Sequence, residues 1–197
     1  GYNISEEPFF KKNIHFVDNL KFRGSYGIVG NDGIGSSVYT YEKTYSSGSG
    51  KGYIFGETSN TASSGIIEPT LSNTEITWET LTDANIGLDL KMFKGKLSFT
   101  ADFYKKRRED ILTQRSSVAA SFGASLPFVK LGIVENKGYE FDLTFRDNAF
   151  SNKLSYFINA QISHSENKVV FRDEGVAKYP WLGLTGKPVG HLPPVLR

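Results

Sequence analysis

The chain has 197 residues, of which 39% are hydrophobic and 22% are charged, and its formal net charge is +2. This composition excludes a disordered tail, and the near-balance of charge argues against nucleic acid as a partner. The absence of cysteine excludes a disulfide scaffold and a thiolate metal site, and no run of about 18 apolar residues could form a transmembrane helix. Twenty Gly, fifteen Phe and ten Tyr favour β structure.

The first predicted strand covers residues 20–26. Leu20, Phe22, Gly24 and Tyr26 alternate with Lys21, Arg23 and Ser25. Successive side chains of a strand point to opposite faces, so this pattern predicts a strand with one apolar face and one polar face.

A long hairpin is predicted over residues 80–104. Its strands alternate apolar and polar residues on both sides of a Lys94-Gly95 turn, and this turn would place Leu90 opposite Phe99 and Leu88 opposite Ala101. The alternation runs from about Thr80 to Met92, which is longer than the five or six residues of most globular strands.

A basic run, Lys105 to Arg108, follows at the expected outer end of this hairpin. It can neutralise phosphates of lipopolysaccharide, because lysine and arginine both bind phosphate. Such a run is more often a solvated strand end, and Glu109-Asp110 offsets its charge. We therefore take the solvated end as the first interpretation.

A second hairpin is predicted over residues 139–162, with a polar turn at 147–153. Pairing Phe145 with Leu154 and Phe141 with Ile158 aligns the apolar residues of both strands on one face. Only Phe157 breaks the alternation.

The connections between the predicted strands are of two kinds. Those at 93–96 and 147–153 are short, whereas 30–75, 107–136 and the chain after 165 are long and rich in Gly and Ser. Short turns at one end and long loops at the other are typical of an outer-membrane β-barrel with periplasmic turns and extracellular loops. A soluble antiparallel sheet shows the same alternation, but strand length and the placement of Trp78, Tyr104, Tyr139 and Tyr156 near strand ends favour the membrane.

The fold class predicted is therefore all-β, an antiparallel transmembrane β-barrel segment built as a meander of long hairpins. In such a barrel the charged strand residues would face the lumen, where water and opposite charges surround them. Solvation and inter-strand pairing are their expected roles, with direct substrate contact as the alternative. The residues concerned are Asp89, Lys91, Asp102, Glu140, Asp142 and Arg146.

The first long loop carries the candidates for ligand contact. Aromatic rings stack on the apolar faces of sugars, and long extracellular loops are where a transporter meets its cargo. Packing above the membrane is the alternative role for these rings. The candidates are Tyr39, Tyr41, Tyr45, Tyr53 and Phe55.

No pattern in the sequence favours catalysis. His15, His164 and His191 lie far apart without metal-ligand spacing, and no serine has the context of a nucleophile elbow. The Gly-rich runs at 30–35 and 48–52 match no nucleotide-binding fingerprint. We expect no enzyme activity, no cofactor and no metal.

Several short motifs, in their order along the chain, resemble the late barrel of TonB-dependent outer-membrane transporters of the SusC/RagA-like group. The resemblance covers most of the chain. The motifs are Ile4-Ser5-Glu6-Glu7 with Phe9, Leu20 to Gly27, Gly30-Asn31, Thr77-Trp78-Glu79, Asn85 to Asp89, Phe103 to Lys106, Asp110-Ile111-Leu112, Val134 to Glu140 and Gly186 to Gly190. The last residues, 191–197, depart from the family pattern.

The resemblance implies that residues 1–197 are a partial TonB-dependent receptor β-barrel domain in the cell outer membrane, with the plug and N-terminal regions absent. It implies import of nutrients, oligosaccharides or peptides, with a SusD-like surface lipoprotein as partner. TonB would be contacted through the missing N-terminal part, and outer-membrane lipid or lipopolysaccharide would surround the barrel. The alternatives are a small self-contained outer-membrane barrel and a soluble carbohydrate-binding β-sandwich.

Overall fold

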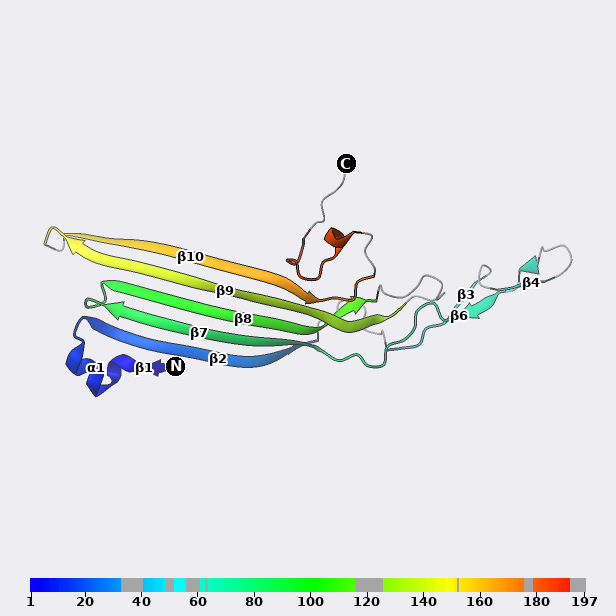
Figure 1. Ribbon diagram of the computed structural model, residues 1–197, viewed down its shortest axis with the longest axis horizontal. Helices are drawn as coiled ribbons and strands as arrows, with labels where there is room; N and C mark the ends of the chain where they lie inside the picture. The colour runs from blue at the N-terminus through cyan, green and yellow to red at the C-terminus, as the bar shows by residue number, and fades with distance from the viewer. Residues whose placement is uncertain are drawn as a thin grey trace, which may run out of the picture.

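A six-stranded antiparallel sheet forms the body of the protein, in the order β1-β2-β7-β8-β9-β10. The computed structural model describes residues 1–32, 41–48, 52–55, 61–62, 64–115, 126–151, 153–175 and 179–191. The sheet is open, because β1 and β10 are its two edges (Figure 1). Its strands are β1 (Tyr2–Asn3), β2 (Val17–Asn31), β7 (Glu79–Met92), β8 (Leu97–Gln114), β9 (Phe128–Ala149) and β10 (Leu154–Phe171).

Smaller elements lie at both ends of this sheet. At one end are the helices η1 (Ile4–Glu6) and α1 (Pro8–Asn13). At the other end, β3 (Ser46–Gly48) pairs with β6 (Gly65–Ile67), and β4 (Ile54–Phe55) pairs with β5 (Thr61–Ala62). The short helix η4 (Pro180–Leu182) follows β10. Among the described residues, no helix has the length and apolarity needed to cross a membrane.

The predicted first hairpin is confirmed in its register. Leu88 pairs with Ala101 and Leu90 with Phe99. The turn closes with a hydrogen bond from Lys96 N to Phe93 O at 3.4 Å, and its central residues Lys94 and Gly95 have φ values of 58° and 77°. Phe93, which precedes them, also has a positive φ of 58°. Positive φ values at the two central turn residues match the right-handed twist of the flanking strands, so the Lys-Gly pair sets the register here.

The predicted register of the second hairpin was wrong by four residues. Ile158 pairs with Phe145 rather than Phe141, and Leu154 pairs with Ala149. β9 continues to Ala149, through part of the polar stretch predicted as the turn, and the turn closes with a hydrogen bond from Lys153 N to Phe150 O at 3.2 Å. A shift by an even number keeps each side chain on its predicted face, so the assignment of faces was unaffected.

The strands extend further into the long connections than predicted. β8 continues to Gln114, β9 begins at Phe128 and β10 continues to Phe171. The basic run is therefore not a strand end but lies within β8, where alternate residues occupy opposite faces. The register shifts beyond Arg108, where Asp110 has a φ of 59°, as expected of a β-bulge.

The two faces of the sheet differ sharply in polarity. On what we call the apolar face, the register aligns a row across five strands, with equivalent rows on both sides of it: Phe22, Leu88, Ala101, Phe141 and Ile162. This face is uncovered: Ile86 is 66% exposed and Ile162 is 64% exposed. Among the described residues, only Phe10 and Ala101 are buried hydrophobic residues, so the sheet has no internal core. A face of this kind requires an apolar surrounding.

The two ends of the sheet also differ, as predicted. Both short turns lie at the end that carries α1, and β3, β4 and β6 lie beyond the opposite end (Figure 1). We call these the short-turn end and the long-connection end. The layout agrees with that of a transmembrane barrel.

Candidate functional site

The polar face, opposite the apolar face, brings the six predicted charged residues to one side of the sheet. In the register, Arg23, Gly87, Asp102, Glu140 and Ser163 form one row across five strands. Four of the predicted residues lie on the same side in neighbouring rows: Asp89, Lys91, Asp142 and Arg146.

Arg23 joins three strands on the polar face. Its Nη2 donates hydrogen bonds to Asp89 Oδ1 and to Asp102 Oδ2, each at 3.0 Å, and its Nε lies 2.8 Å from Asp89 Oδ2. Gly87 makes this arrangement possible. A Cβ at that position would lie 2.6 Å from Asp102 Oδ1 and 2.8 Å from Arg23 Cζ. The guanidinium therefore lies close to a glycine and links two carboxylates that would otherwise repel each other.

Asp142 is the centre of a second polar network, between β9 and β10. Its carboxylate accepts hydrogen bonds from Gln161 Nε2 at 2.6 Å, from Asn159 Nδ2 at 3.0 Å and from Thr144 Oγ1 at 3.1 Å. These donors are neutral, so they orient the carboxylate without neutralising its charge.

A hollow of about 360 Å³ lies between these two networks. Asp102, Glu140 and Asp142 line it together with Gln161 and Ser163. Glu140 has no hydrogen bond or ion pair to any described side chain. Carboxylates are acceptors, so the hollow can take hydroxyl or amide donors of a ligand. No group of three metal-ligating side chains occurs within the described part of the chain.

The remaining predicted charged residues lie nearer the short-turn end. Lys91 forms no ion pair with any of the residues that the structure describes. Arg146 lines a hollow of about 440 Å³ with Lys96 and Asp147, which pair at 2.6 Å. Lys91 and Arg146 thus stand apart from the carboxylates around the first hollow.

The aromatic ligand-contact candidates lie in the segment between β2 and β7. Tyr41, Tyr45 and Tyr53 are exposed there, and Phe55 lies in β4. Tyr39 lies outside the described residues. β3, β4 and β6 of this segment lie beyond the long-connection end of the sheet (Figure 1). The structure does not bring these aromatic residues together with the charged residues of the polar face.

The chain after β10 folds back over the polar face, which the sequence pattern did not predict. Val169 N donates to Lys187 O at 2.9 Å and Val189 N donates to Asn167 Oδ1 at 2.6 Å. With Lys106 and Arg108, Val189 lines a hollow of about 500 Å³. The available signals were Gly186 and Gly190, whose φ values are positive and mark turns.

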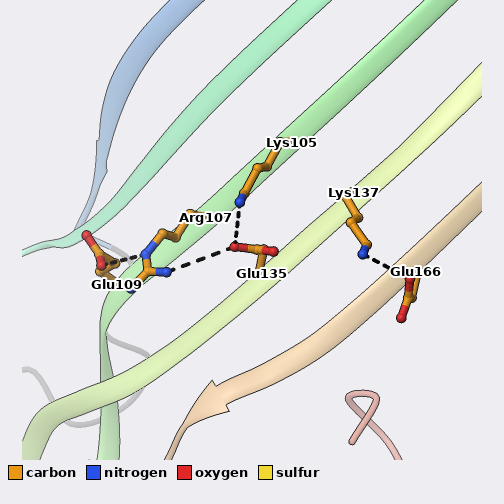
Figure 2. A network of polar contacts seen from close by, with 6 residues as sticks. All are labelled: Lys105, Arg107, Glu109, Glu135, Lys137 and Glu166. Atoms are coloured by element: carbon orange, nitrogen blue, oxygen red, sulfur yellow. Dashed lines mark hydrogen bonds and ion pairs between the residues drawn. The ribbon is translucent and has the colours of Figure 1, made fainter. Parts of the chain in front are cut away.

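The apolar side of the sheet carries its own charged residues beyond the apolar rows. Figure 2 shows this outer charge cluster on β8, β9 and β10. Lys105 Nζ lies 3.1 Å from Glu135 Oε2, and Lys137 Nζ lies 3.4 Å from Glu166 Oε2. The six residues of the cluster are Lys105, Arg107, Glu109, Glu135, Lys137 and Glu166.

Known proteins with similar sequences share one family description. The model of the family described as "TonB dependent receptor-like, beta-barrel" matches residues 10–195. TonB-dependent receptor P3 of Formosa agariphila is 29% identical over 175 residues, which are 89% of this chain and 16% of that protein. TonB-dependent receptor SusC of Bacteroides thetaiotaomicron is 29% identical over 175 residues, 84% of this chain and 16% of SusC. The chain thus spans about one sixth of the length of these relatives.

Solved structures show the same fold. A structure of the RagAB peptide importer in its "open-open" state superposes with a TM-score of 0.70 at 21% identity, covering 90% of this chain and 18% of that one. A structure of the RagAB peptide transporter gives a TM-score of 0.67 at 21% identity, covering 95% of this chain and 20% of that one. At this identity the likeness concerns the fold alone.

Proposed function

Because the chain belongs to the TonB-dependent receptor-like β-barrel family, an outer-membrane family of receptors and transporters rather than enzymes, we propose that it forms part of a nutrient importer. In this proposal residues 1–197 supply neighbouring strands of one large barrel. The plug and the segment that contacts TonB belong to the parent polypeptide outside these residues.

The uncovered apolar face is the observation that carries this proposal. A soluble β-sandwich would bury such a face under a second sheet, and the other sheets in the described residues have only two strands each. Lipid supplies the apolar surrounding instead. The polar face then lines the lumen, the short turns are periplasmic, and the long connections are extracellular.

Oligosaccharides and peptides are the proposed cargo. Acceptors in the hollow lined by Asp102, Glu140 and Asp142 suit the hydroxyl groups of the first and the amide groups of the second. The exposed tyrosines at the long-connection end suit stacking on either. A SusD-like surface lipoprotein is the proposed partner, supported by the likeness to SusC and to RagAB.

An uptake assay tests the proposal. Cells that express the intact parent protein are given labelled oligosaccharides or labelled peptides, with and without functional TonB. We expect TonB-dependent uptake of one class, and a loss of uptake when the parent gene is deleted. Uptake that is unchanged by either deletion would contradict the proposal.

A further inference from the structure

Charged residues bracket the apolar face along β9. Asp147 lies on that face at the short-turn end and Lys137 lies on it at the other end, ten residues away. At about 3.4 Å per residue this is about 34 Å along the strand. A strand tilt of about 35–45° reduces it to a height of about 24–28 Å, compared with about 25 Å for the apolar band of a barrel.

The outer charge cluster therefore begins where the hydrocarbon layer ends. Aromatic residues mark the same boundary: Phe103 and Tyr139, which precede the cluster by one row, pair with each other in the register. Their ring centroids are 6.5 Å apart. Beyond such an aromatic girdle lie the lipid headgroups rather than bulk water.

Lys105 and Lys137 are directly opposite each other in this first charged row. Like charges at directly opposite positions destabilise a sheet unless other charges compensate. Each ammonium group has a carboxylate neighbour, yet the two side chains remain 60% and 59% exposed. Both lysines thus keep donors free for a further acceptor.

One carboxylate of the cluster, Glu135, is shared among several cations. Glu135 lies near both Lys105 and Arg107, and its distance from Arg107 Nη1 is 4.0 Å (Figure 2). Lys168 lies opposite Glu135 in the register without an ion pair to any described residue. Glu135 therefore faces three cations, and a further anionic group beside Lys105 would be favoured there.

From this geometry we propose that Lys105 and Lys137 bind a phosphate of an outer-leaflet lipid headgroup. The inference rests on the proposed orientation of the barrel, and it adds a lipid site on the outer wall that is separate from the cargo path. Lysine binds phosphate as a compact point charge, and two lysines on adjacent strands can hold one phosphate between them.

Lipid binding to the intact parent protein in detergent tests the proposal, with phosphorylated lipid A as the probe and native mass spectrometry as the readout. A basic side chain near an anionic membrane surface contributes about 1 kcal/mol. We therefore expect K105Q/K137Q to bind lipid A about 30-fold more weakly than the wild type. Dephosphorylated lipid A and inorganic phosphate should each bind the wild type far more weakly.

The matched control is K106Q/R108Q, which removes the same amount of charge from the polar face of β8, the strand that also carries Lys105. Its affinity for lipid A should equal that of the wild type. E166Q leaves both lysines in place and frees Lys137 from its ion pair, so it should bind lipid A more tightly, and it keeps the proposal testable if the double variant does not fold.

Three outcomes would overturn the inference. The two double variants could lose affinity for lipid A equally, or the wild type could bind dephosphorylated lipid A as tightly as lipid A, or it could bind inorganic phosphate as tightly as lipid A. Uptake of cargo is measured on the same variants. If the wild type shows TonB-dependent uptake of cargo but does not bind lipid A, this inference alone is overturned. If the wild type shows no uptake, the proposed function is overturned.

Discussion

The apolar and polar faces of this sheet are built from the same strands, and adjacent residues face opposite surroundings. Ala101 packs in a row of hydrophobic side chains, whereas its neighbour Asp102 accepts a hydrogen bond from Arg23. On the apolar face the side chains contact their neighbours and are otherwise uncovered, while on the polar face they form networks across strands. The difference shows that stability on one face depends on excluding charge, and on the other on pairing it.

The largest difference in the free energy of unfolding is expected between two variants that place an arginine on opposite faces of β10. Ile162→Arg puts a charge in the middle of the apolar face, where arginine costs about 2–4 kcal/mol in a bilayer. Ser163→Arg puts the same residue beside Glu140 on the polar face and should cost little. The free energy of unfolding of the intact barrel in lipid vesicles measures both. Equal costs would mean that the two faces do not have different surroundings.

A smaller effect is expected from adding one methyl group to the polar face. Gly87→Ala would force the guanidinium of Arg23 away from Asp102, because its Cβ would lie 2.8 Å from Arg23 Cζ. Hydrogen bonds between charged groups contribute about 1.5–3 kcal/mol, and the Arg23 side chain is 35% exposed, so we expect a loss of about 1–2 kcal/mol.

Gly27→Ala is the control for this variant, because it lies on the same face and its Cβ would have no neighbour within 4 Å. It should leave the free energy of unfolding unchanged or slightly raised. If Gly27→Ala lost as much stability as Gly87→Ala, any side chain on this part of the polar face would be destabilising. The loss in Gly87→Ala could then not be assigned to the bridge made by Arg23.

The smallest effects separate paired from unpaired charges on the polar face. A double-mutant cycle of Arg23→Gln and Asp102→Asn should give a coupling of about 0.2–1 kcal/mol, because the pair is partly screened by water. Lys91→Gln should change the free energy of unfolding by less than about 0.5 kcal/mol, since Lys91 has no ion pair among the described residues. A larger effect for Lys91→Gln than for Arg23→Gln would contradict this assignment of pairs.

The sequence predicted the faces better than the strand ends. Period-two alternation places Leu88 and Asp89 on opposite sides whatever the register, and the Lys94-Gly95 turn sets the register of the first hairpin. The second turn was misplaced because Asp147 and Asn148 have turn-like composition, although Asp147 pairs with Lys96 and remains in the strand.

The extensions of β8 and β9 were missed because ion pairs replace apolar alternation there. Arg108 and Glu79 face each other across β7 and β8 at 2.8 Å, and such a contact leaves no periodic signal in one strand alone. The bridge made by Arg23 was missed for the same reason, since its partners lie 66 and 79 residues away. Contacts between residues so far apart in the sequence depend on the register of several strands at once.

Two spin labels on adjacent residues of β7 test whether the apolar face of the sheet contacts lipid. Residues 1–197 contain no cysteine, so Leu88→Cys and Asp89→Cys each introduce a single label within them, in the intact parent protein with any other cysteines removed. In lipid vesicles we predict that the label at position 88 is relaxed by oxygen dissolved in the bilayer and the label at 89 by a water-soluble nickel complex. The opposite pattern, or water contact at both positions, would contradict the assignment of the apolar face to lipid.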